Sequence, residues 1–423
     1  MAERVIFHVD VNSAFLSWTA AYRVKVLGQK EDLRQIPSVV AGDKAERRSI
    51  ILAKSLPAKK YGIQTGEPLF QAQQKCPRLT VVPPDYGLYV EASRHLMALL
   101  RQVSPLVEQY SIDEAWVDMT GTRLLYGSPV LAAQMLCRRI REELGFTVNI
   151  GVSSNKLLAK MASDFEKPDR VHTLFPEEME KKLWPLPVRR LFMVGPATER
   201  KLRYMGIHTI GELAGADPAF LRQKLHKPGL LLWDSANGRG DAVLAEKPPE
   251  NQGYGNSVTT ATDVTDAQTA HQVLLSLCET VGMRMRQDGK AGGCVTVFLR
   301  TAQFENFSHQ GQLPGATDVT SELYHAACRI FDEAWDGKTP LRQLGVQVSK
   351  LTAERYRQFD FWNAVSAGQY ERMAKLDCVV DDLREKYGER AIFRGCFPGG
   401  AAAMAGGLSK ERRTGVTKPV PDL

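Results

Sequence analysis

The order of apolar and polar positions predicts a chain of short strands and amphipathic helices. Val5 to Val9 form a nearly unbroken apolar run that ends in Asp10, a pattern typical of a strand buried on both faces. A helix over 12–27 follows, with Asn12 or Ser13 as its cap. The other expected elements up to residue 165 are strands at 79–82, 107–110, 115–119 and 146–152 and helices at about 86–103, 129–144 and 155–165.

A similar alternation of strands and helices returns in the second half of the chain. Residues 166–240 are mainly helical in pattern, and a polar, proline-containing stretch at 241–252 indicates a linker. Two βαββαβ units separated by a helical segment predict an α+β multidomain fold. The elements expected beyond the linker are strands near 256–264, 294–301, 304–312 and 341–349 and helices at 265–288, with Thr265 as cap, and near 319–336 and 368–388.

Acidic side chains gather at the ends of predicted strands. Asp113 and Glu114 separate two strands of a hairpin, and they can share a site only near a turn, because neighbours on a flat strand point to opposite faces. Asp and Glu are also ordinary turn residues, so this pair alone decides little. Asp10 supplies a third carboxylate. Two Mg²⁺ ions held by such a cluster can activate a 3′-oxygen and stabilise leaving pyrophosphate.

Composition narrows the class of protein only modestly. A length of 423 residues predicts two to four domains, and a net charge of +7 fits a nucleic-acid partner without requiring one. Seven scattered cysteines without a C-x-x-C pair favour neither a zinc site nor a disulfide framework, and indicate a reducing cytoplasm. We also expect no signal peptide and no membrane partner, since no apolar run reaches membrane-spanning length.

The segment from Asp10 to Phe15, Asp-Val-Asn-Ser-Ala-Phe, together with Ser111-Ile112-Asp113-Glu114, resembles the Y-family translesion DNA polymerases, most closely their bacterial polymerase IV group. The resemblance runs from about residue 4 to residue 350. It implies a palm (1–11 and 78–165), fingers (12–77), a thumb with a helix-hairpin-helix (166–240), a linker (241–252), a little finger (253–351) and a tail (352–423).

The resemblance also implies roles for single residues of the palm. Asp10, Asp113 and Glu114 would be catalytic and would bind two Mg²⁺ ions, with the carbonyl of Val11 as a further ligand. Glu114 would also help to position the primer 3′-hydroxyl. Phe15 would be the steric gate that excludes a 2′-hydroxyl, although a core aromatic is the alternative for this position.

Nucleotide-binding lysines are expected in the fingers and the palm. Lys59 and Lys160 would hold the triphosphate, and an ordinary surface lysine is the alternative reading of Lys160. The family usually has Thr, Tyr and Arg where this chain has Ala53, Leu56 and Lys59. Since lysine lacks the bidentate fork of arginine, we expect a looser hold on the triphosphate, or compensation by Lys54 or Lys60.

DNA contacts are expected in the thumb and the little finger. Gly195 lies in a partial match to the hairpin that approaches DNA phosphates through backbone N–H groups, with a plain helical hairpin as the alternative. The segment 252–351 has 8 Lys/Arg against 10 Asp/Glu. Its DNA contacts, and a modest affinity, would therefore depend on a local face that includes Arg284, Arg286, Lys290 and Arg300.

The tail contains a possible partner-binding peptide. Gln358, Phe361 and Trp362 are similar to the clamp-binding peptides of bacterial polymerases, in which bulky apolar groups fill a pocket on the sliding clamp. These aromatic side chains would otherwise pack on the body of the protein. Residues 399–423 are Gly/Ala-rich and then basic, and we expect them to be disordered.

The sequence therefore predicts a template-directed DNA polymerase of low fidelity for translesion synthesis and repair. It would be a cytoplasmic monomer that acts on primer-template DNA and deoxynucleoside triphosphates. The alternative is a catalytically weak DNA-binding accessory factor recruited by the sliding clamp. A nucleotide cyclase is a more distant alternative, because cyclases use a related palm.

Overall fold

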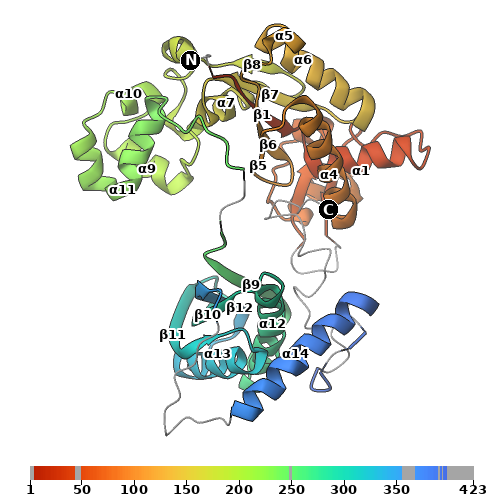
Figure 1. Cartoon of the computed structure of the whole chain (residues 1–423), viewed down its shortest axis with the longest axis vertical. Coiled ribbons are helices and arrows are strands. Elements are labelled where there is room, and N and C mark those ends of the chain that lie inside the picture. Colours follow the sequence, from red (N-terminus) through yellow and green to blue (C-terminus); the bar gives the residue numbers. More distant parts are fainter. Residues whose placement is uncertain are drawn as a thin grey trace. The chain divides into compact units, whose positions relative to one another are not determined.

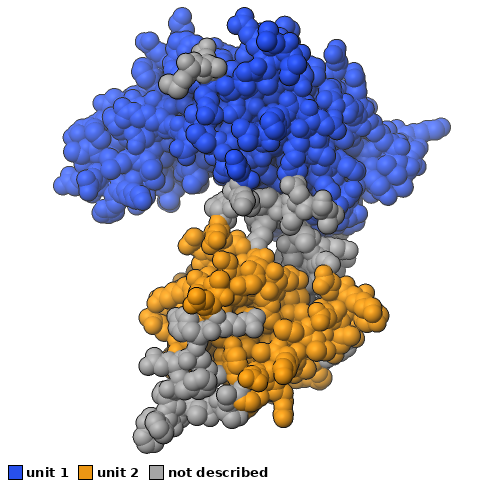
Figure 2. Space-filling model, viewed as in Figure 1, with its two compact units in different colours: residues 1–45, 49–248, 415–423 blue, residues 46–48, 249–414 orange. Residues whose placement is uncertain are grey.

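The computed structural model describes residues 4–42, 49–246, 250–354, 367–388, 391–392 and 394–397. These residues divide into two compact units, one holding those up to 246 and the other those from 250 (Figure 2). Each unit has its own apolar core. No helix among the described residues is long and apolar enough to cross a membrane.

A five-stranded sheet forms the centre of the first unit (Figure 1). Its order is β5-β6-β1-β7-β8, in which β1 runs antiparallel to both of its neighbours and β8 runs parallel to β7. The first four strands have the order expected of a βαββαβ palm. The strands are β1 (Ile6–Val11), β5 (Val107–Gln109), β6 (Glu114–Asp118), β7 (Val148–Ser153) and β8 (Val171–Thr173).

The two faces of this sheet differ in chemistry because side chains alternate along each strand. Phe7, Val9 and Val11 enter the main apolar core, which α4 (Tyr86–Val103) and α6 (Pro129–Arg139) complete. Ile6, His8 and Asp10 take the opposite face, which is covered by α7 (Lys156–Ser163) (Figure 1). The short α5 (Arg123–Tyr126) precedes α6, and a π-helical turn (Ile140–Leu144) follows it.

A smaller lobe is inserted between β1 and α4. Its sheet has the order β3-β2-β4, with β2 antiparallel to β3 and parallel to β4. Helix α1 joins the lobe to β1, and Leu16 and Ala20 of α1 pack against Val40 and Ala53 of the lobe. The elements are α1 (Ala14–Lys25), β2 (Ser38–Ala41), β3 (Ile51–Lys54), α2 (Leu56–Lys60), α3 (Leu69–Lys75) and β4 (Thr80–Val82).

Residues 174–236 form a helical lobe whose apolar core also includes Leu158, Met161 and Ala162 of α7. Thr209 opens α10 with a capping box, since its hydroxyl accepts from Glu212 N and the Glu212 carboxylate accepts from Thr209 N. The first helix of the expected helix-hairpin-helix, which would precede Gly195, is only a 3₁₀ turn, Val188–Arg190. The elements are 3₁₀ turns Pro176–Glu178 and Val188–Arg190 and helices α8 (Met179–Lys182), α9 (Pro196–Tyr204), α10 (Ile210–Ala214) and α11 (Pro218–Ala236).

The second unit is a four-stranded antiparallel sheet with helices on one face (Figure 1). The sheet order is β11-β10-β12-β9. The predicted cap Thr265 is wrong by one position, because Asp266 accepts the bond from Thr269 N. The elements are β9 (Gly253–Val264), α12 (Ala267–Gln287), β10 (Ala291–Thr301), β11 (Asn306–Thr317), α13 (Thr320–Ala334), β12 (Leu341–Thr352) and α14 (Ala367–Tyr387).

Helix α14 attaches to this unit through buried ion pairs. Arg286 of α12 contacts Asp381 at 2.6 Å and Asp377 at 3.3 Å, and Arg384 contacts Glu279 at 3.0 Å. The prediction that Arg286 contributes to a DNA-binding face is therefore wrong, because its guanidinium is buried and already paired.

The close packing of α7 on the central sheet depends on Gly151 of β7. A Cβ at this position would lie 1.9 Å from the carbonyl oxygen of Ala159 and 2.5 Å from Ser163 N, both in the backbone of α7. We predict that Gly151→Ala destabilises the first unit by about 3 kcal/mol or more, since neither backbone atom can move alone. Gly87→Ala in α4 is the control, because its nearest neighbour would be at 3.5 Å. Urea unfolding measures both variants, and equal stability would contradict this packing.

Candidate active site

Strand pairing brings Asp10 and Glu114 together. The two residues are direct partners in the antiparallel register between β1 and β6. Both side chains lie on the face that α7 covers, together with His8 and its partner Trp116. Residues directly opposite each other on neighbouring strands have Cβ atoms about 5 Å apart. The predicted meeting of these two carboxylates is confirmed.

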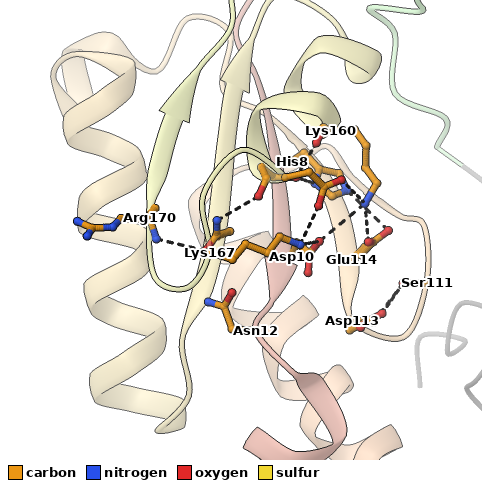
Figure 3. Close-up of polar contacts among 12 residues, drawn as sticks. His8, Asp10, Asn12, Ser111, Asp113, Glu114, Lys160, Lys167 and Arg170 are labelled. Atoms are coloured by element: carbon orange, nitrogen blue, oxygen red, sulfur yellow. Dashed lines mark hydrogen bonds and ion pairs between the residues drawn. The ribbon is translucent and has the colours of Figure 1, made fainter. Parts of the chain in front are cut away.

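Asp113 lies in the turn that precedes β6, as the hairpin pattern predicts. Its carbonyl accepts from Val11 N at 3.1 Å, which fastens the turn to the end of β1. Its carboxylate accepts from the Ser111 hydroxyl at 2.7 Å (Figure 3). The turn is what allows Asp113 and Glu114 to lie near Asp10, since on a regular strand one of them would face the apolar core.

Two lysines neutralise this acidic pair (Figure 3). Lys160 of α7 is only 8% exposed and places its Nζ 2.6 Å from Glu114 and 3.8 Å from Asp10. Lys167 places its Nζ 2.7 Å from Asp10 and 2.8 Å from Asp164. The site therefore alternates negative and positive groups within a partly enclosed space.

Burial and charge oppose each other in the protonation of these groups. Burial raises the pKa of Glu114 above its ordinary value, more than the charge of Lys160 lowers it. Burial also raises the pKa of Asp113, against the hydrogen bond from Ser111. Burial lowers the pKa of Lys160, but Glu114 and Asp10 outweigh it, so that the net shift is upward. Negative charge at this site is costly unless a cation balances it.

Sequence reasoning missed His8 and the role of Lys167. His8 is fully buried, and its Nδ1 lies 2.8 Å from the Ser163 hydroxyl, while its Nε2 has no hydrogen-bond partner among the described residues and lies 3.8 Å from Glu114. Burial, and then the charges of the two lysines, lower the pKa of His8, so that the ring is neutral. A histidine two positions before Asp10 in an apolar strand was the available signal, because it shares the face of Asp10.

Phe15 packs face to face on an aromatic neighbour. Its ring stacks on Tyr89 with centroids 4.4 Å apart and an interplanar angle of 7°, and Tyr86 meets it edge-on at 6.3 Å. The side chain is nevertheless only partly buried. Packing of this kind holds the ring in one orientation, which both a core aromatic and a steric gate require.

The three unusual finger residues lie along β3 and α2. Ala53 is 7% exposed and packs in the core of the smaller lobe, whereas Leu56, the first residue of α2, is 51% exposed. Lys59 is exposed in the last turn of α2. Burial and the neighbouring Lys59 charge lower the pKa of Lys54, which places two cations near each other here.

The remaining predicted residues lie away from this cluster. Gly195 is the N-cap of α9 and has open space where a Cβ would stand. Gln358, Phe361 and Trp362 lie outside the described residues. Among the described residues, no three His, Cys, Asp or Glu side chains already converge in the arrangement of a metal centre. Asp113 accepts from Ser111, and Lys160 contacts both of the other two acids.

The fold defines the class of protein first. The structure matches a solved Y-family DNA polymerase chimera with a TM-score of 0.70, 21% identity and coverage of 82% of this chain and 98% of that one. The fold is therefore the palm, fingers, thumb and little finger of Y-family polymerases.

The sequence comparisons then give the family. The impB/mucB/samB family model matches residues 9–164, and the model of its C-terminal domain matches residues 251–361. The chain is 44% identical to DNA polymerase IV of Clostridium acetobutylicum over 391 residues, which cover 92% of this chain and 97% of that protein. It is 38% identical to DNA polymerase IV of Moorella thermoacetica, with 89% and 93% covered. The chain belongs to the impB/mucB/samB family, and the resemblance inferred from its motifs is confirmed.

The Lys160–Glu114 pair gives a test of the site that needs no substrate. We predict that Lys160→Met destabilises the first unit by about 2–3 kcal/mol, because it leaves Glu114 largely buried without its cation. Lys160→Met combined with Glu114→Gln should recover most of this loss. Urea unfolding in the presence of a chelator, with hydrogen exchange of the β1 and β6 amides, measures both variants. A double variant no more stable than the single one would show that the pair is not coupled.

Proposed function

We propose that the protein is a template-directed DNA polymerase of low fidelity that acts in translesion synthesis and DNA repair. The observation that carries this is the match, over nearly the whole chain, to relatives named DNA polymerase IV, in a Y-family polymerase fold. Primer-template DNA and deoxynucleoside triphosphates are the substrates. Family members generally depend on divalent metal ions.

The acidic cluster supports a site for two Mg²⁺ ions. Its donors would be carboxylate oxygens of Asp10, Asp113 and Glu114, with the Val11 carbonyl as a further ligand, and Mg²⁺ prefers such oxygen ligands. The two lysines that now neutralise the acids show that the site accommodates positive charge. When bound, the ions supply activation of the primer 3′-hydroxyl and stabilisation of the leaving pyrophosphate.

The residues of the chain would then bind and orient the nucleotide. Lys160 and Lys59 would hold its phosphates, and Glu114 would help to orient the primer terminus. The Phe15 ring, fixed by Tyr89, would lie where a 2′-hydroxyl would overlap it. With Ala53 and Leu56 in the fingers, no hydroxyl supports the triphosphate there, and the nearby Lys54 is the available compensating cation.

The remaining assignments are part of the same proposal. The palm comprises 1–11 and 78–165, the fingers 12–77, the thumb 166–240, the linker 241–252, the little finger 253–351 and the tail 352–423. Gly195 would approach a DNA phosphate through its backbone. Gln358, Phe361 and Trp362 would contact a sliding clamp, and the polymerase would act as a cytoplasmic monomer.

The alternatives have less support. An accessory factor without catalytic activity would not require Asp10 and Glu114 to face each other at the end of paired strands. None of the relatives described above carries the name of an accessory factor or a cyclase. The separate helical lobe and the second sheet unit also have no use in a cyclase.

Primer extension tests the catalytic proposal directly. We predict that the purified protein extends a primer with Mg²⁺ and all four deoxynucleotides. Asp113→Ala should lower the rate at least about a hundredfold. Mutations of residues that only support a metal ligand cost roughly 10–100-fold, and loss of a ligand should cost at least as much. Glu91→Ala, an acid exposed on α4, is the control and should extend normally. Inactivity of the unaltered protein on a primer-template that it binds would instead favour the accessory factor.

Sugar selectivity tests the assignment of Phe15. We predict that Phe15→Ala raises ribonucleotide incorporation relative to deoxynucleotides by roughly 10–200-fold, because a small cavity then accepts the 2′-hydroxyl. Phe70→Ala, which removes an exposed ring from α3, should leave selectivity unchanged. Single-nucleotide insertion with each sugar measures the ratio. Unchanged selectivity in Phe15→Ala would leave Phe15 as a core aromatic.

A further inference from the structure

The helical lobe of the first unit carries a groove that the proposed active site does not use. It is lined by residues of α9 and α11, two helices labelled in Figure 1, and by Met205, and it has a volume of about 460 Å³. Clefts of about 300–1,000 Å³ are typical of ligand sites. Its floor is apolar, with Met205 and Leu225, and its lining includes three cations and one tyrosine but no carboxylate.

The groove arises from the spacing of residues along α9. Ala197, Arg200, Lys201 and Tyr204 recur every three to four positions and therefore share one face of the helix. Leu202 points the other way and is fully buried in the core of the lobe. Helix α9 ends at Tyr204 because Gly206 adopts φ +80°, a conformation that favours glycine. Tyr204 is thus the last residue of a helix whose opposite face is buried in the core of the lobe.

The cations of the groove are left without acidic partners. The carboxylate of Glu199, the one acid on α9, lies 3.7 Å from Arg189 and 3.5 Å from Arg203. Among the described residues, no hydrogen bond or ion pair involves the charged groups of Arg200 and Lys201. The Nζ of Lys224, on α11, lies 6.0 Å from the centre of the Phe220 ring, a weak cation–π contact. Positive charge is therefore concentrated and available here.

Tyr204 is unusually exposed for an aromatic residue. Its side chain is 95% exposed, although it stands beside an apolar floor into which it could fold. An exposed ring next to unpaired cations is the combination that binds single-stranded nucleic acid, in which bases stack on the ring and phosphates contact the cations. A duplex offers the phosphates but keeps its bases paired and stacked on each other.

We propose that this groove binds single-stranded DNA, with an unpaired base stacked on Tyr204 and the adjoining phosphates held by Arg200, Lys201 and Lys224. The inference rests on the proposed function in one respect: the unpaired template of a polymerase supplies the strand. The site lies on α9 and α11, apart from the carboxylates of the central sheet, and takes part in holding the template and not in the chemical step.

Binding of a fluorescein-labelled oligothymidylate to the full chain tests this proposal, with fluorescence anisotropy as the readout. We expect Tyr204→Ala to weaken the affinity at least about fivefold, the lower end of the effect of losing one stacked base. Tyr204→Phe keeps the ring and should bind like the unaltered protein. The affinity for a blunt duplex should change little in both variants. Thermal unfolding verifies that the variants fold, and a fully exposed side chain should not alter it.

The salt dependence of binding tests the cations. We expect Arg200→Ala and Lys224→Ala each to lower the slope of log affinity against log salt by about 0.7, the value for one lost phosphate contact on a single strand. Lys181→Ala, an exposed lysine on α8 outside the groove, is the matched control and should leave the slope unchanged.

The outcomes separate this site from the polymerase proposal, because the binding assay contains neither Mg²⁺ nor nucleotides. Unchanged single-strand affinity in Tyr204→Ala, or an equal loss for the blunt duplex, would overturn the groove while leaving primer extension intact. Weakened binding by Tyr204→Phe to the level of Tyr204→Ala would also overturn it, since the ring would then not be the contact. If the protein does not extend primers but Tyr204→Ala and Tyr204→Phe bind single strands as expected above, the polymerase proposal alone would be overturned.

Discussion

Two carboxylates that face each other across paired strands determine how the rest of the first unit is built. Asp10 and Glu114 are register partners in an antiparallel ladder, where like charges directly opposite each other destabilise the sheet. The unit compensates for this repulsion with Lys160 and Lys167. Lys160 reaches the acids because α7 lies directly on the sheet, and that closeness requires the absence of a side chain at Gly151. The close packing of α7 on the sheet is therefore also what brings Lys160 to the two acids.

The surroundings of the charged side chains differ between the palm and the fingers. In the palm, Asp10 and Glu114 each contact a lysine, and the buried His8 lies 3.8 Å from Glu114 on the same face of the sheet. A change of charge there disturbs several contacts at once. In the fingers, Leu56 and Lys59 are exposed, and only Ala53 belongs to a core. Two of the three departures from the family pattern, Leu56 and Lys59, therefore lie where packing imposes little, whereas Ala53 lies in a core.

Local patterns were enough to predict the two strands that carry Asp10 and Glu114 and the meeting of these acids, but not the strands at Ser38–Ala41 and Val171–Thr173. The apolar run before Asp10 and the hairpin around Asp113 follow from alternation and turn chemistry, which act over a few residues. The lysine contacts depend on packing between distant segments, and so local patterns did not predict that Lys167 contacts Asp10. Gly195 shows an intermediate case: the hairpin residues are adjacent in sequence, but the helix expected before them is a single 3₁₀ turn. Tertiary contacts decide such lengths.

Arg286 shows how a charge count can mislead when a distant segment supplies the partner. The segment 252–351 is acidic overall, and Arg286 was one of its few cations, yet Asp377 and Asp381 of α14 bury it from outside that segment. The outward face of the sheet has a hollow of about 570 Å³ in which Arg300 is the one charged lining residue. A DNA backbone on that face would meet mainly amide and hydroxyl groups, such as Gln343 and Gln347, which displace few counterions. Its hold would then depend on shape more than on salt.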